Sequence, residues 1–168
     1  MNLPICHECL NSELLCPDCQ EKLDSGEISQ NEVDFSRSVA RLSERYHSFE
    51  KAELVKTMHS GNISIVVVPK GTAGNFIGRR GIFIKELSSQ LGKRVKVIEE
   101  TKDVKDAIQN ILFPARFLGI NVMYASDGKE VYKVRVSKSD IKKIPEPKEF
   151  EAIFTELLDK GEARLVFE

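Results

Sequence analysis

The sequence lacks the features of a membrane or exported protein. It has no run of about 18 consecutive apolar residues, so no membrane span is expected. Its first ten residues, MNLPICHECL, lack the basic start and apolar core of a signal peptide. With 41% apolar residues among 168, the chain can still build a packed core, as one large domain or two small ones. We therefore expect a globular protein of the cytoplasm that makes no membrane contact.

The sequence also lacks the side-chain groupings that catalysis requires. It has no paired carboxylates in a motif, no nucleophile with a matching base, and no metal-ligand set with an open position. Gly-Lys-Ser/Thr of a P-loop does not occur, and the glycines do not follow the GxGxxG of dinucleotide-binding folds. His47 and His59 are expected to be ordinary surface or turn residues. We therefore predict that the protein is not an enzyme and has no small-molecule substrate.

Cysteine is absent beyond residue 19, and the four cysteines form two CxxC pairs, Cys6 with Cys9 and Cys16 with Cys19. Each pair can direct two thiolates at one centre, and two pairs complete the tetrahedron that zinc takes in closed structural sites. This short segment has few large apolar residues, so it could hardly fold without a metal ion that joins the two pairs. We predict one structural Zn²⁺ in a knuckle over residues 1–28.

Three other uses of the cysteines compete with zinc. Iron can occupy the same thiolate cage, and two disulfides are a weaker alternative because the chain is expected in a reducing compartment. A redox CxxC pair needs no second pair and so explains less of the pattern. His7 lies inside the first pair, but four cysteines already fill the metal shell, so we expect His7 to be exposed or outside it.

Charge is unevenly distributed although the net charge is only -1. Residues 1–35 carry one lysine against eight acids, and residues 145–168 carry three bases against seven acids. Between them, residues 60–100 carry seven bases against three acids, and residues 101–144 nine against five. A basic middle between acidic ends suggests a polyanion site, and a solvated charged surface is the alternative.

Hydrophobic periodicity predicts the same order of elements twice. The first copy is a helix over about 30–47 capped by Ser29 or Asn31, strands over 52–58 and 62–68 joined by HSGN, short helices around Gly78 and Gly81, and a strand over 94–98. The second is a helix over 103–113, strands over 117–125 and 131–136 joined by SDGK, a helix over 146–161 and a strand over 163–167. A helix–strand–strand–helix–strand repeat predicts an α+β fold.

The most specific motif is FIGRRGIFIKEL, residues 76–87. It resembles the core of a KH domain, whose signature is IGxxGxxI followed by leucine or isoleucine; a plain strand-to-helix turn is the alternative. A GxxG turn between two helices lets a nucleic-acid backbone approach closely, and it clamps about four nucleotides. Basic residues in the turn can then neutralise phosphates. The RNA-binding residues implied are Ile77, Gly78, Arg79, Arg80, Gly81, Ile82 and Lys85, with Val95 and Val97 on the following strand as groove-lining candidates.

The resemblance extends beyond the glycines. The helix and strands before GxxG resemble a type II KH arrangement, and residues 111–141 resemble the second KH domain in the tandem module of the NusA family, in particular its short archaeal form. This implies two type II KH-like domains, over 29–101 and 102–168, each a three-stranded sheet with helices on one face. The second copy is degenerate, because no glycine occurs between Gly128 and Gly161. Lys142 and Lys143 there are expected on a solvated face.

Two functions follow from this interpretation. The first is a non-enzymatic protein that binds single-stranded RNA through the GRRG turn, in transcription elongation or termination as the NusA resemblance implies. The second is an adaptor on RNA polymerase or the ribosome, in which the acidic knuckle makes the main protein contact. The acidity of the knuckle favours protein over phosphate as its partner.

Overall fold

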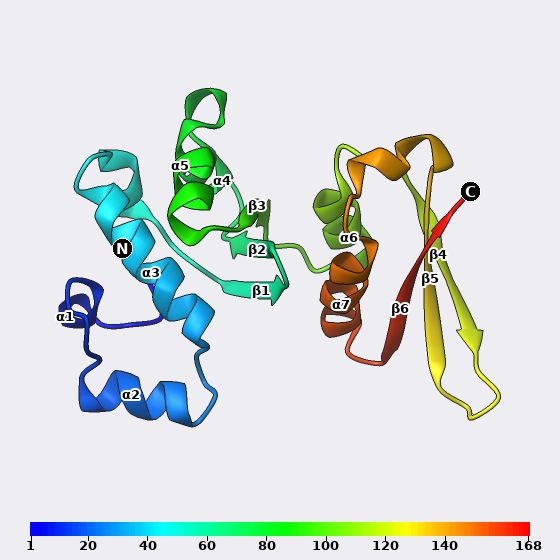
Figure 1. The fold of residues 1–168 in the computed structure, drawn as a ribbon, viewed down its shortest axis with the longest axis horizontal. Helices are drawn as coiled ribbons and strands as arrows, with labels where there is room; N and C mark the ends of the chain where they lie inside the picture. Colours follow the sequence, from blue (N-terminus) through cyan, green and yellow to red (C-terminus); the bar gives the residue numbers. More distant parts are fainter. The chain divides into compact units, whose positions relative to one another are not determined.

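The computed structural model describes all 168 residues and shows an α+β protein with two three-stranded sheets (Figure 1). The predicted α+β class is therefore confirmed. The chain divides into two compact units, residues 1–57 with 64–99 and residues 58–63 with 100–168. We call them the N-terminal and C-terminal units. None of the helices combines the length and the apolar character needed to cross a membrane.

The elements of the first half are α1 (His7–Leu10), α2 (Pro17–Asp24), α3 (Gln30–Ser43), η1 (His47–Lys51), β1 (Lys56–Ser60), β2 (Ile63–Val68), α4 (Ala73–Ile77), η2 (Arg79–Gly81), α5 (Ile82–Leu91) and β3 (Arg94–Glu99). Those of the second half are α6 (Val104–Leu112), β4 (Phe117–Tyr124), β5 (Glu130–Val136), η3 (Lys138–Lys143), α7 (Pro147–Leu158) and β6 (Gly161–Phe167). The repeated helix–strand–strand–helix–strand order is present.

Helix α3 begins at a capping box and ends earlier than the sequence predicts. The Ser29 side chain accepts a hydrogen bond from the Glu32 N–H, and the Glu32 carboxylate accepts one from the Ser29 N–H at 2.8 Å. The helix ends at Ser43, and residues 47–51 form the 3₁₀ turn η1. The turn buries Phe49, whose ring packs edge-on against Phe76 at a centroid distance of 5.7 Å. Burial of this aromatic side chain stops the helix before residue 47.

The first sheet has the strand order β1-β2-β3, and its first strand is displaced from the prediction. The sequence predicts a strand over 52–58, but β1 covers Lys56–Ser60. Residues 52–54 instead contact the N-terminus, because the Asn2 N–H donates to the Ala52 carbonyl at 2.9 Å and the Leu54 N–H donates to the Asn2 carbonyl at 3.2 Å. A partner far away in sequence thus sets the start of β1, and the apolar pattern alone could not place it.

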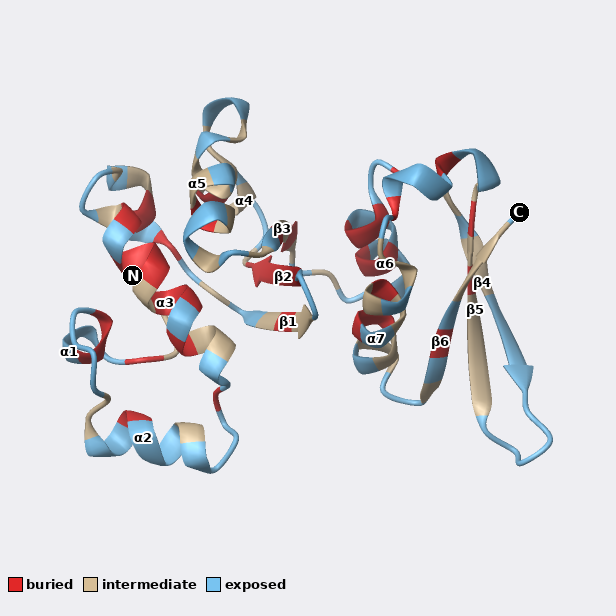
Figure 2. Ribbon diagram, in the orientation of Figure 1, coloured by how far each residue is buried: buried red, intermediate tan, exposed pale blue.

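Helix α3 is buried on two sides. Phe35, Val39 and Leu42 join a core with the inward residues of β2, and Val33 and Ala40 join a smaller cluster with the cysteine segment. All six residues of β2 are buried, as Figure 2 shows along that strand. The larger core comprises Phe35, Val39, Leu42, Phe49, Ala52, Val66, Val68, Phe76, Leu87 and Val95.

The C-terminal unit contains the second sheet, with the order β4-β5-β6 and helices α6 and α7 on one face (Figure 1). Strands β4 and β5 are antiparallel, joined through the predicted turn at residues 126–129, and β5 and β6 are parallel. The fully buried side chains of this unit include Phe154 of α7, Ile108 of α6 and Val134 of β5. Strand β4 is largely exposed (Figure 2).

The 3₁₀ segment η3 follows β5, where the first copy of the repeat has α4 and the glycines. Its Asp140 is 4% exposed. The carboxylate accepts hydrogen bonds from the Arg116 N–H at 2.9 Å and from the Lys143 ammonium at 2.7 Å. These bonds hold the pKa of Asp140 at about 2, with the Lys143 contact as the largest cause. A buried carboxylate therefore ties η3 to the residue that precedes β4.

Replacing Asp140 tests this anchor through its pH dependence. The folded state keeps the carboxyl ionised to a lower pH than the unfolded chain, in which its pKa is 3.8. Its stabilisation is therefore complete above about pH 4 and is lost as the pH falls through about 2. We expect Asp140→Asn to lower the urea midpoint at neutral pH, by an amount that shrinks to nothing at acidic pH.

Asp106→Asn is the matched control for the Asp140 experiment, because Asp106 is exposed on α6. An exposed acid in the first turn of a helix contributes at most about 1 kcal/mol, so the urea midpoint of this variant should stay close to that of the wild-type chain at every pH. A constant deficit of Asp140→Asn across the whole pH range would contradict the ion-pair role of the carboxylate.

Candidate metal centre and nucleic-acid interface

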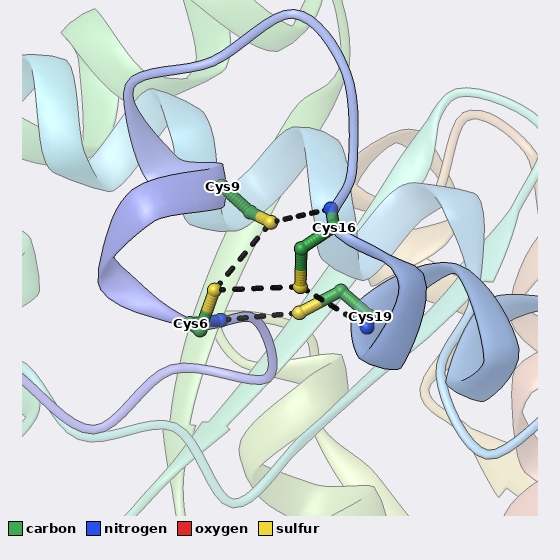
Figure 3. Close-up of side chains that lie close together, drawn as sticks. All are labelled: Cys6, Cys9, Cys16 and Cys19. Carbon is green, nitrogen blue, oxygen red and sulfur yellow. Dashed lines mark hydrogen bonds between the residues drawn. The ribbon is translucent and has the colours of Figure 1, made fainter.

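The four cysteines converge at the N-terminus (Figure 3). Their sulfur atoms all lie within 4.8 Å of one another. The Cys6 sulfur is 3.5 Å from that of Cys9 and 3.8 Å from that of Cys16. Four sulfurs bound to one zinc at about 2.3 Å would stand about 3.8 Å apart, so the observed spacing fits a tetrahedral thiolate cage. The thiols could therefore hold one metal ion.

Backbone amides turn toward the sulfur atoms. The Cys16 N–H donates to the Cys9 sulfur at 3.1 Å, and the Cys6 N–H donates to the Cys19 sulfur at 3.4 Å. Cys16 is also the N-cap of α2, where its sulfur accepts from the Cys19 N–H at 3.5 Å. Such bonds favour thiolate over thiol, because an amide proton stabilises the negative sulfur. The backbone of the two CxxC turns thus supplies amide donors to three of the four sulfur atoms.

The thiol pKa values diverge within the cluster. Hydrogen bonding from the backbone of Cys9 lowers the pKa of Cys6 to about 7, whereas burial raises the pKa of Cys9 to about 12. A buried thiol of this kind ionises when a cation compensates its charge, and thiolate is the form that zinc binds. The donor set therefore fits a structural ion with no open coordination position.

Helix α3 holds the cysteine segment in place. The Arg37 Nε–H donates to the Cys9 carbonyl at 3.3 Å, and its guanidinium also donates to the Glu13 carbonyl at 3.0 Å. Val33 and Ala40 pack against Ile5 and the buried cysteines. The knuckle is therefore part of the same compact unit as α3.

The glycine turn lies between α4 and α5. Gly78 ends α4 with φ +71°, and Gly81 precedes α5 with φ +72°. The Gly81 N–H donates to the Gly78 carbonyl at 3.1 Å, which closes the turn. Arg80 also has a positive φ, of +55°, which is unfavourable for a residue with a side chain. Strained backbone of this kind concentrates at functional sites.

The aromatic ring of Phe83 packs against the glycine turn. A Cβ atom on Gly78 would overlap the ring of Phe83, so only glycine fits there. The Phe83 ring packs in turn on Tyr46, with a centroid distance of 4.6 Å. The Tyr46 hydroxyl donates to Glu86 at 2.9 Å, and Arg45 pairs with the same carboxylate. The first turn of α5 is thus fixed to the end of α3.

The predicted RNA-binding residues fall into three groups by exposure. Arg79, Arg80 and Lys85 are exposed, and Ile82 is 49% exposed. Ile77, Gly78, Gly81 and Val97 are partly buried, and Val97 packs against the core. Val95 differs from the expectation, because it is 6% exposed and belongs to the core cluster.

The placement of Val95 follows from strand alternation. Successive side chains of a strand point to opposite faces, and in β3 Val95 takes the face toward the core. Phe83 is the residue that sequence reasoning missed. The Phe83 ring lies against Gly78, and the apolar pattern of residues 82–85 does not predict this contact.

No model of a known protein family matches the sequence, and no curated protein matches it. Among solved structures, the chain is similar to the crystal structure of APE1850, with a TM-score of 0.56 and 23% sequence identity. The similarity covers 77% of this chain and 96% of that chain. At this level of identity the likeness shows a shared fold.

Metal content tests the cysteine cluster. We expect the purified protein to contain close to one zinc per chain by elemental analysis, because four thiolates in a tetrahedral cage fill its shell. Cys9→Ser should lose the metal and lower the melting temperature, since the buried ligand is removed. Ser12→Ala, in the loop between the two pairs, should retain both metal and stability. A metal-free chain with a stably folded N-terminal segment would refute the site.

The glycine turn is tested by two alanine substitutions only four residues apart. Gly78→Ala should destabilise the protein by about 1–3 kcal/mol, because it adds a Cβ at positive φ against Phe83. Gly74→Ala lies in α4 with open space around it, and should be neutral or stabilising by up to about 1 kcal/mol. Chemical denaturation of both variants measures the difference. Equal stabilities would show that the turn tolerates a side chain.

Proposed function

We propose that the protein is a non-enzymatic, single-stranded RNA-binding protein of the KH type, and that the GRRG turn grips the RNA backbone. The observation that carries the proposal is the shape of residues 78–81. Two glycines at positive φ leave the backbone of the turn open, and the two side chains between them are exposed arginines. A glycine-flanked turn of this kind between two helices is what a KH module uses to clamp nucleotides.

Charge supports the proposal. Arg79 and Arg80 make no ion pair with any carboxylate of the chain, so both guanidinium groups are available to phosphate. Lys85, one turn into α5, adds an exposed ammonium. Arginine suits this task because its planar fork can bind two phosphate oxygens at once.

The C-terminal unit has a different part in this proposal. Its fold repeats that of the first KH-like domain, but η3 replaces the glycine turn, and Asp140 puts a carboxylate where a clamp would need open backbone. The RNA contact therefore falls on residues 77–82. Together the domains resemble a NusA-type tandem module, so we place the protein in transcription elongation or termination.

A second candidate function is an adaptor on RNA polymerase or the ribosome. The cysteine segment and its entry into α3 carry one lysine against eight acids over residues 1–35. A cavity of about 440 Å³ lies beside it, lined by apolar residues such as Leu3 and Leu10 and by polar ones such as His7 and Glu44. In this alternative the knuckle makes the main contact and RNA binding is secondary.

Reversing the charge of the turn tests the proposal. We expect the double variant Arg79→Asp, Arg80→Asp to lose at least about tenfold in affinity for a mixed-sequence single-stranded RNA oligonucleotide, because two phosphate interactions become repulsive. The salt dependence of binding should also become shallower, by about 0.7 in log–log slope for each phosphate that the protein no longer neutralises. Fluorescence anisotropy across a salt series measures both quantities.

The matched control is Lys102→Asp, Lys105→Asp, which makes the same charge change at exposed positions outside the turn. This variant should bind RNA within about twofold of wild type, because neither lysine belongs to residues 77–82, to which the proposal assigns the RNA contact. Thermal melts should show that both variants fold. Undiminished RNA affinity in the turn variant would reject the proposal and favour the adaptor.

A further inference from the structure

Strand β4 is an edge strand with no charged residue. The two sheets have four edge strands, β1, β3, β4 and β6. The other three carry charges, namely Lys56 in β1, Arg94 and Lys96 in β3, and Glu162 and Arg164 in β6. Natural proteins use such charges, or proline, to stop an open edge from pairing with another chain. The eight residues of β4, FLGINVMY, contain neither.

Strand β4 also exposes apolar side chains. Leu118, Val122 and Met123 are 46%, 48% and 45% exposed, and Tyr124 is 70% exposed. Four of the large exposed apolar residues of the chain therefore fall within one strand of eight residues. Exposed apolar residues in one continuous stretch mark interaction sites more often than scattered ones do.

The hydrogen-bond pattern shows which backbone groups face the open edge. The Ala125 N–H donates to the Lys129 carbonyl at 2.8 Å, next to the pair Tyr124–Glu130 in the register of β4 with β5. Hydrogen bonding alternates along an antiparallel pair. The N–H and C=O groups of Ile120, Val122 and Tyr124 therefore point away from β5, to the side where the sheet has no further strand.

We propose that β4 pairs antiparallel with β4 of a second copy of this chain, across a two-fold axis at Asn121. In this register the outward-pointing groups of Ile120 bond to those of Val122 in the second copy, and the reverse. Asn121 stands opposite itself, where two amide side chains can each donate and accept a hydrogen bond. Met123 stands opposite Gly119, where its side chain meets the Arg135 guanidinium, whose Nη2 donates to the Leu118 carbonyl at 3.2 Å. The β4-β5-β6 sheets of the two copies then form one sheet of six strands.

Self-pairing is favoured over other occupants by the absence of charge. In a two-fold pairing every strand residue meets its own kind or a near neighbour, so any charge on β4 would oppose a like charge. Strand β4 has none to oppose. The Lys133 side chains of the two copies would be separated by three strand spacings of about 4.8 Å. The Arg135 guanidinium lies over Gly119 and donates to the Leu118 carbonyl, and four residues, about 13 Å of strand, would separate it from its copy. Both separations exceed the Debye length at physiological salt.

The test uses the full-length, metal-loaded chain in sedimentation velocity over a range of concentrations. We expect the wild-type chain to form a dimer. Asn121→Lys should weaken dimerisation at least about fivefold, because it sets two like charges directly opposite each other. Asn121→Glu should do the same. An equimolar mixture of the two variants should recover the dimer, since opposite charges then meet at the axis.

Asn110→Lys is the control, because it makes the same substitution at an exposed position of α6. It should dimerise like wild type. A wild-type chain that stays monomeric at all concentrations overturns the proposal, as does a dimer that Asn121→Lys leaves intact. Failure of the mixture to recover the dimer also overturns it. If the two copies of residue 121 face each other, the lysine of one variant meets the glutamate of the other and the two should attract. Circular dichroism confirms that each variant folds.

Discussion

The two-sided burial of α3 is the constraint on which the rest of the N-terminal unit depends. One side of the helix packs against the core of the first sheet through Val39 and Leu42, and the other packs against the cysteine segment through Val33 and Ala40. Arg37 adds a hydrogen bond to the Cys9 carbonyl. The candidate metal site and the frame of the glycine turn therefore share one support, and a change in the packing of α3 reaches both.

The two halves of the chain leave their central strands in different ways. In the first, an open turn with glycines at both ends rests on the ring of Phe83. In the second, a 3₁₀ segment is closed on itself and on Arg116 by the carboxylate of Asp140. Local contacts stabilise both segments, but the two segments present different surfaces. The open turn offers bare backbone and cations, whereas in the closed one the carboxylate is already paired with neighbouring bases.

Much of this can be predicted where the controlling interaction is local. The spacing of Cys6, Cys9, Cys16 and Cys19 is enough to predict that their thiols cluster, because each CxxC turn is short. Glycine position likewise indicates the turn at 78–81. Features set by distant partners are not accessible in this way. The start of β1 depends on Asn2, the end of α3 on the burial of Phe49, and the core position of Val95 on which face of β3 meets the helices.

The pairing of Asn2 with residues 52–54 has a consequence for chain entropy. It closes a long loop that contains the cysteine segment, and α3 anchors the far end of that segment. The entropy cost of closing a loop grows only slowly with its length, so closing this long loop costs little more than closing a short one. The two anchors then already restrict the conformations of the segment that carries the thiols. A metal ion that joins the four sulfurs then closes a short loop inside a tethered one. Lengthening the chain before Met1 would leave this tether intact, whereas deleting residues 1–3 would release it.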